Sequence, residues 1–161
     1  MNKPAPFTAR AVLSDPFHCL AFGAGAGLIP YAPGTAGTLV ALPVYTLLQP
    51  LSLSLYLAVL VVMLAVGTWI CGRASVALGV HDHSGIVWDE IVGYLITMLT
   101  APPGWGWMLA GFVVFRLFDI AKPWPVSLID RRMGGGAGIM LDDIVAGLYA
   151  LVAMHVLAMF F

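Results

Sequence analysis

The feature that most constrains this chain is a long segment without formal charge: residues 16–72 contain no Asp, Glu, Lys or Arg. A spanning segment in a bilayer excludes charged side chains, and few soluble domains lack them over such a length. The whole chain of 161 residues is 61% hydrophobic and 9% charged, and its mean hydropathy is +0.97. These values predict an integral membrane protein that forms a single domain over residues 1–161.

Charge and cysteine content exclude other classes of protein. The formal net charge is −1, so no basic surface indicates a nucleic-acid partner. Cys19 and Cys71 match neither a disulfide framework nor a zinc motif, and we expect both to pack as small hydrophobic residues. Asp15 and Pro16 interrupt the apolar run after the basic N-terminal residues. We therefore expect a retained cytoplasmic N-terminus rather than a signal peptide.

The pattern of apolar segments and breakers predicts an all-α fold with roughly four to five membrane helices. Residues 17–38 are apolar but interrupted by several glycines and prolines, so we expect a broken or re-entrant segment buried in protein. Residues 51–72 are the clearest spanning segment, because they are long enough to cross roughly 30 Å of hydrocarbon. The other expected helices cover about 39–48, 84–100, 107–121 and 141–161.

The positions of the charged residues predict which end of the protein is functional. All charges after residue 72 fall within 73–90 or 116–143, which the expected helices place on one side of the membrane. Arg73 marks that side as cytoplasmic by the positive-inside tendency. Trp105 and Trp107, in the turn between two helices, suit the opposite interface. We therefore expect an active site at the cytoplasmic face of a multi-pass membrane protein.

The segment 115–125 concentrates charge at the end of an apolar helix. Arg116, Asp119 and Lys122 are three residues apart and share one helix face, and Pro123 ends the helix. A charged face is costly beside lipid unless it contacts protein, water or a ligand. Because Arg116 and Lys122 lie one turn on either side of Asp119, we expect Asp119 to stay ionised and to point into the same cavity.

Two pairs of acids stand at the start of two expected helices with similar local sequence. Residues 89–93 read Asp-Glu-Ile-Val-Gly, and residues 142–147 read Asp-Asp-Ile-Val-Ala-Gly. Gly93 and Gly147 each follow an acid by four residues, which predicts close helix packing one turn deeper on the same face. Acids at helix starts also complement the helix dipole. Two such pairs in a chain so poor in charge favour a functional site.

Acids beside cations indicate phosphate-ester chemistry. Carboxylate oxygens suit Mg²⁺, which bridges protein and substrate phosphate, so we predict Mg²⁺ ligands among Asp89, Glu90, Asp142 and Asp143. Substrate phosphate is expected to bind Arg116, Lys122 and Arg131, with Thr35 and Thr38 in a possible phosphate cradle at a helix start. Residues 33–38 could equally form only a tight turn. The catalytic candidates are Asp119, Asp89, Asp143 and Lys122. Their division between metal binding and proton transfer stays open, as does attack by water or by an aspartate.

Several blocks of this sequence resemble bacterial phosphatidylglycerophosphatase A: 33–35, 81–90, 115–125, 130–131 and 138–147. The resemblance covers residues 16–150. It implies an all-helical, Mg²⁺-dependent lipid phosphatase of the inner membrane, which converts phosphatidylglycerophosphate to phosphatidylglycerol and inorganic phosphate in glycerophospholipid synthesis. The chain departs from the family pattern at residues 134–136, which are Gly-Gly-Gly where His-Gly-Gly is expected. A catalytic histidine at that position is therefore in doubt.

Other functions for intramembrane acids are a transporter or another phospholipid-headgroup enzyme. A transporter would not need acids and cations together in two loops on one side. The acidic motif of CDP-alcohol phosphotransferases and the Ser-Gly-His motif of histidine-dependent lipid phosphatases are both absent from the sequence. We expect a loop or capping role for His83, and we expect His155 to hydrogen-bond to a neighbouring helix.

Overall fold

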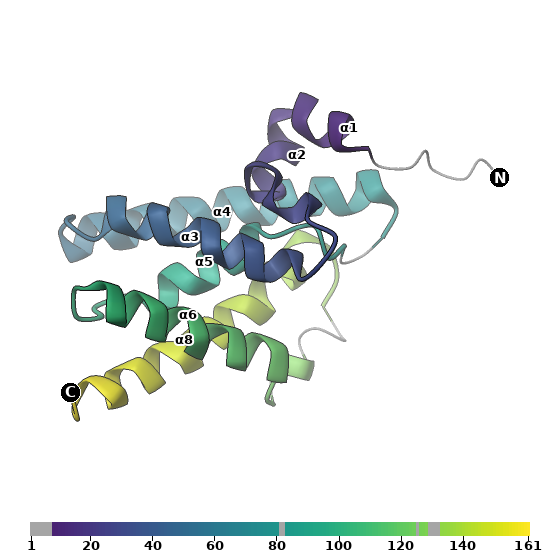
Figure 1. Ribbon diagram of the computed structural model, residues 1–161. Coiled ribbons are helices and arrows are strands. Elements are labelled where there is room, and N and C mark those ends of the chain that lie inside the picture. Colours follow the sequence, from purple (N-terminus) through teal and green to yellow (C-terminus); the bar gives the residue numbers. More distant parts are fainter. Residues whose placement is uncertain (1–7, 81–82, 125, 129–132) are drawn as a thin grey trace.

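The computed structural model describes residues 8–80, 83–124, 126–128 and 133–161, and every regular element in these ranges is a helix (Figure 1). The all-α prediction is therefore confirmed for the part of the chain that is described. The helices are α1 (Ala9–Ser14), α2 (Pro16–Ala21), the 3₁₀ helix η1 (Gly23–Leu28), α3 (Pro33–Leu48), α4 (Leu53–Leu78), α5 (Trp88–Thr97), α6 (Trp105–Ala121) and α8 (Gly135–Ala158).

The short helix α5 lies at the centre of the bundle, where α3, α4, α6 and α8 all pack against it (Figure 1). Val92, Tyr94 and Leu95 are completely buried, as expected for a helix that is apolar on every side. Two tyrosines of the bundle fix the position of α5 through hydrogen bonds: Tyr56 donates to the carbonyl of Leu95 at 2.8 Å, and Tyr94 donates to the carbonyl of Met108 at 3.0 Å.

The N-terminal part of the chain is broken into short helices, as the sequence predicts. Asp15 ends α1 and caps α2 by accepting the backbone N–H of Phe17 at 2.8 Å, while Pro16 occupies the first helical position, which suits its fixed φ. η1 packs directly on the loop before α5. A Cβ on Gly27 would lie 1.9 Å from the carbonyl oxygen of Gly85, so only glycine permits this contact.

Among the described residues, two helices are long and apolar enough to cross a membrane by length and composition alone, α4 with 26 residues and α8 with 24. The helix α3 is apolar but has 16 residues. α5 has ten residues and is only about 15 Å long, so it cannot span a bilayer by itself. The described part of the chain thus supports two candidate spans, and the four to five membrane helices expected from the sequence are not confirmed.

α3, α4 and α8 extend well beyond their predicted ends, and α6 begins two residues early, so that Trp105 and Trp107 lie in its first turn rather than in the preceding turn. α3 begins at Pro33 rather than near residue 39, because proline fits the first turn of a helix. α4 continues past Arg73 to Leu78 and ends at Gly79, whose φ is +66°. Arg73 therefore lies inside a helix rather than at its end, and it pairs with Asp15 at 3.6 Å.

The early start of α8 determines whether Asp142 and Asp143 can act as helix-capping acids. The helix begins at Gly135, not near Leu141, because the glycine run packs into the bundle: a Cβ on Gly136 would lie 1.8 Å from the carbonyl oxygen of Thr68 in α4. Asp142 and Asp143 consequently lie about two turns inside α8. The helix dipole acts mainly within the first turn, so capping does not account for these two buried acids.

The predicted close contact at Gly93 and Gly147 is confirmed. A Cβ on Gly147 would lie 2.6 Å from the carbonyl oxygen of Gly93, and a Cβ on Gly93 would lie 2.9 Å from the carbonyl oxygen of Asp143. The backbones of α5 and α8 therefore touch one turn below the acids. The buried Thr97 lies at this contact, since its hydroxyl is 3.0 Å from the Gly93 carbonyl of its own helix and 3.5 Å from the Gly147 carbonyl of α8.

Three further side chains bear on predictions from the sequence. His155 hydrogen-bonds with the hydroxyl of Thr100 at 2.8 Å, which confirms its expected role between segments. Cys71 is buried as predicted, whereas Cys19 is only half-buried.

The contact between α5 and α8 predicts the effect of adding one methyl group. Gly147→Ala should lower the free energy of unfolding by about 1–3 kcal/mol, because the new Cβ overlaps a backbone carbonyl that cannot move easily. Thermal unfolding in detergent, followed by tryptophan fluorescence, would measure this loss. Gly106→Ala is the matched control, since nothing lies within 4 Å of its Cβ. Equal stability of the two variants would contradict the proposed tight contact.

Candidate active site

A cavity of about 300 Å³ collects most of the charged residues singled out in the sequence. Its walls come from the start of α3, the loop before α5, the first turn of α5, the end of α6 and the middle of α8. The lining residues are Ala32, Pro33, Gly34, Ser84, Ile86, Asp89, Glu90, Arg116, Asp119, Ile120, Lys122, Asp142 and Asp143. Tertiary packing thus brings two cations and five acids to one cavity. They come from α5, from α8, and from α6 with the residue that caps its end.

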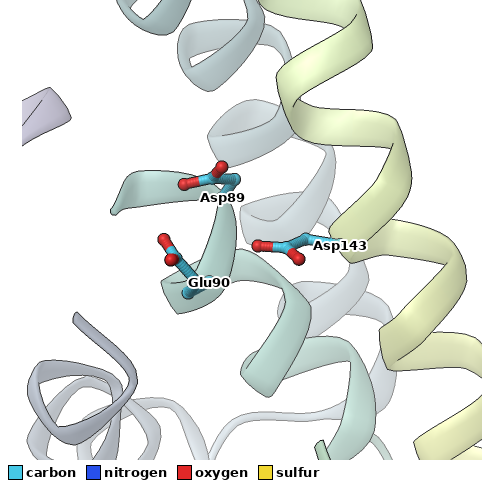
Figure 2. A group of neighbouring side chains, drawn as sticks. All are labelled: Asp89, Glu90 and Asp143. Carbon is cyan, nitrogen blue, oxygen red and sulfur yellow. The ribbon is translucent and has the colours of Figure 1, made fainter. Parts of the chain in front are cut away.

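Three of the acids form a compact group. Asp89 and Glu90 project from the first turn of α5, and Asp143 reaches them from α8, so that one oxygen of each lies within 4.8 Å of the others. Figure 2 shows the three carboxylates turned toward a common space. Glu90 Oε2 is buried and has no hydrogen-bond partner among the described residues. We call Asp89, Glu90 and Asp143 the three-acid group.

The three-acid group concentrates negative charge in a buried space. Burial raises the pKa of Glu90 well above its usual range, and the nearby negative charge of Asp143 raises it further, although Arg116 opposes the shift. Three ionised carboxylates so close together need a positive partner. The orphaned Glu90 oxygen and the all-oxygen donor set fit a hard divalent cation such as Mg²⁺.

The two cations of the cavity pair with different acids. Arg116 donates from Nη1 to Oδ2 of Asp119, one turn later on α6. Lys122 donates from Nζ to Oδ2 of Asp142 on α8 at 2.9 Å. Lys122 lines the same cavity as Asp119, as expected, but its pairing with Asp142 was not predicted from the sequence.

The reason for this difference is the end of α6. The helix ends at Ala121, and Lys122 adopts a left-handed φ of +40° as the C-cap residue before Pro123. Helical spacing of three residues therefore stops applying at Lys122, and its side chain reaches α8. Asp142 is drawn toward Lys122 and lies outside the three-acid group.

The start of α3 closes the cavity against the acids. A Cβ on Gly34 would lie 2.3 Å from Glu90 Oε1 and 3.1 Å from Arg116 Nη1. Glycine at this position therefore lets the first turn of α3 contact both Glu90 and Arg116. This contact was not predicted from the sequence, although the Pro-Gly pair at a helix start was its visible signal.

Of the remaining predicted substrate-binding residues, the two threonines are described by the structure and do not line the cavity. Thr38 is completely buried and donates to the carbonyl of Gly34 at 2.8 Å. Thr35 is half-buried one residue beyond the lining position Gly34. Arg131 lies outside the described residues. Their roles in substrate binding stay predictions from the sequence.

Comparison with known proteins identifies the family of the chain. The sequence profile described as phosphatidylglycerophosphatase A matches residues 19–158. The chain belongs to the phosphatidylglycerophosphatase A family. The resemblance seen in the sequence is thereby confirmed. No solved structure matches this chain significantly.

Curated relatives agree with the family assignment. Phosphatidylglycerophosphatase A of Escherichia coli strain K12 is 46% identical over 140 residues, which cover 86% of this chain and 81% of the relative. The protein of the same name from Haemophilus influenzae is 41% identical, with 88% of each chain covered. A Bacteroides thetaiotaomicron protein described as a candidate phosphatidylinositol-3-phosphatase is 39% identical, covering 83% of this chain and 88% of its own.

The electrostatics of the three-acid group predict an unusual pH dependence for the metal-free protein. Because the folded pKa of Glu90 is raised, its contribution to stability is fully present below its ordinary value of 4.5 and is lost as pH rises through the raised value. Thermal unfolding of chelator-treated protein should therefore fall with increasing pH over that window. Glu90→Gln should flatten the dependence. A profile that is identical in both proteins would show that Glu90 ionises without cost.

Proposed function

We propose that this protein is a Mg²⁺-dependent lipid phosphatase that hydrolyses phosphatidylglycerophosphate to phosphatidylglycerol and inorganic phosphate, in glycerophospholipid synthesis. The observation that carries the proposal is the three-acid group beside two cations in one cavity, in a chain of the phosphatidylglycerophosphatase A family. The names of two relatives supply the substrate. A phosphate monoester needs both kinds of group: acids for a metal ion and cations for its own oxygens.

Asp89, Glu90 and Asp143 are the residues that would hold Mg²⁺ in this proposal. When bound, Mg²⁺ supplies Lewis-acid stabilisation of charge on the phosphoryl oxygens and lowers the pKa of coordinated water. Two of the ligands are neighbours on α5, and adjacent helical residues diverge by about 100°. Both side chains can still converge because they lie in the first turn of α5, and this N-terminal end of the helix borders the cavity. Asp142 is assigned to Lys122 rather than to the metal.

Arg116 and Lys122 would bind the phosphate group of the substrate. Each already has one carboxylate partner, so each is held in place before substrate arrives. Arg116 also has its Nε buried without a hydrogen-bond partner among the described residues, which leaves a donor for an anion. Preorganised cations of this kind stabilise charge that develops in the transition state.

Asp119 is the acid that we assign to the attacking water. It lines the cavity but lies outside the three-acid group, and Arg116 holds its carboxylate. An acid that is not a metal ligand can accept a proton from water as the oxygen attacks phosphorus. Asp89 and Asp143 remain the alternatives for this role.

We also propose a multi-pass arrangement in the bacterial inner membrane, with the cavity on the cytoplasmic side. The candidate spans α4 and α8 support membrane insertion. The end of α6, which carries cavity residues, and the start of α8, about two turns before Asp142, lie at one end of the bundle, whereas the α5–α6 connection and the C-terminus lie at the other (Figure 1). The cytoplasmic assignment follows the positive-inside tendency of the sequence.

The metal assignment predicts different behaviour for two neighbouring aspartates. Wild-type phosphate release from phosphatidylglycerophosphate should stop with EDTA and return with Mg²⁺. Asp143→Asn should need a higher Mg²⁺ concentration for half-maximal activity, because it removes a proposed ligand. Asp142→Asn is the matched control, and its Mg²⁺ requirement should stay near that of the wild type. Full turnover in metal-free buffer, or equal Mg²⁺ shifts in both variants, would contradict the assignment.

The phosphate assignment predicts a strong effect at Lys122. Lys122→Ala should lower kcat by about 10²–10³-fold, the usual cost of removing a preorganised charge donor, while the protein stays extractable and folded in detergent. Release of inorganic phosphate by the purified variant at saturating Mg²⁺ measures this. Near-normal turnover would show that Lys122 only anchors the end of α6, as interfacial lysines often do.

A further inference from the structure

A second cavity adjoins the one that holds the acids. It has a volume of about 220 Å³, and Pro33 and Ser84 line both this cavity and the acid cavity. Its other walls come from the end of α2, from η1 and from the loop before α5, and the residues are Phe22, Gly27, Leu28, Ile29, Pro30 and His83. None of these residues belongs to the phosphate chemistry described above.

His83 supplies a hydrogen-bond donor in this second cavity. Its Nδ1 accepts the backbone N–H of Gly85 at 3.0 Å, so the neutral ring carries its proton on Nε2. The ring also packs beside Phe22, with 5.9 Å between the ring centroids. The loop role expected for His83 is thus confirmed. The hydrogen bond to Gly85 and the contact with Phe22 hold the ring from two sides, and Nε2 remains as a hydrogen-bond donor.

The second cavity has both polar and apolar lining residues. Ser84 lies at the shared boundary with Pro33, and His83 precedes Ser84 in sequence, while Leu28, Ile29 and Pro30 are apolar lining residues. Ile29 is 47% exposed, so the apolar wall reaches the outer surface. A lining of this kind suits a molecule that carries both an anionic group and hydrocarbon.

We propose that this second cavity binds the phosphodiester of the lipid substrate, with His83 Nε2 donating a hydrogen bond to a phosphodiester oxygen. The inference rests on the proposed function. In phosphatidylglycerophosphate, a three-carbon glycerol joins the phosphomonoester that is removed to a phosphodiester that remains. Two adjoining cavities, one with acids and cations and one with a neutral donor and an apolar exit, match those two groups in order. His83 is therefore a specificity-determining residue rather than a catalytic one.

The test uses the two reaction products, because each retains one half of the recognised group. Phosphatidylglycerol keeps the phosphodiester, and inorganic phosphate represents the monoester. His83→Asn retains an acceptor for the Gly85 N–H but removes the distal donor. It should raise KM for phosphatidylglycerophosphate and the inhibition constant of short-chain phosphatidylglycerol in detergent micelles by about tenfold, the usual scale for a hydrogen bond to a charged group. The inhibition constant of inorganic phosphate should not change.

His83→Gln is the matched variant, since its longer amide can place a donor near the position of Nε2. It should lose less affinity for phosphatidylglycerol than His83→Asn does. Wild-type values for His83→Asn, or an equal rise for inorganic phosphate, would overturn the proposal while leaving the phosphatase function intact. Failure of the wild type to release phosphate from phosphatidylglycerophosphate would instead overturn the proposed function and this inference together.

Discussion

The contact between α5 and α8 at Gly93 and Gly147 is the constraint on which the site depends. The two backbones touch because neither glycine has a side chain, and this contact lies one turn from Asp89 and Asp143. Acids from two helices can share a metal ion only if the helices approach closely, because carboxylate side chains are short. The small residues thus set the distance at which the three-acid group forms (Figure 2).

Charge inside the bundle is arranged in two kinds of unit. The cations each have a carboxylate partner, Arg116 with Asp119 and Lys122 with Asp142, so they are neutralised where they lie. The three-acid group gathers three carboxylates in one place, and among the described residues Glu90 Oε2 is buried without a hydrogen-bond partner. A divalent cation would add positive charge to this group, and a phosphate group would accept hydrogen bonds from the two cations.

The broken N-terminal segment forms most of the wall of the second cavity. Glycine at position 27 lets η1 pack on the loop before α5, and glycine at position 34 lets α3 begin against Glu90. The chain between these two positions forms the apolar wall of the second cavity. A regular helix here would have filled the space beside the acids. The glycines and prolines of this segment therefore shape a cavity for an amphiphilic substrate instead of forming a membrane-spanning helix.

The sequence by itself determined the helical class, the family, the broken N-terminal segment and the close contact of Gly93 with Gly147, because hydropathy and glycine spacing are local signals. It also singled out the acids and cations that meet in one cavity, since charge is so rare in this chain. Only the tertiary structure decided how they pair. Lys122 pairs with Asp142 on α8 because α6 ends at Ala121, and Asp143 rather than Asp142 joins Asp89 and Glu90. Helix ends and side-chain partners depend on packing between distant segments, which spacing along one helix does not contain.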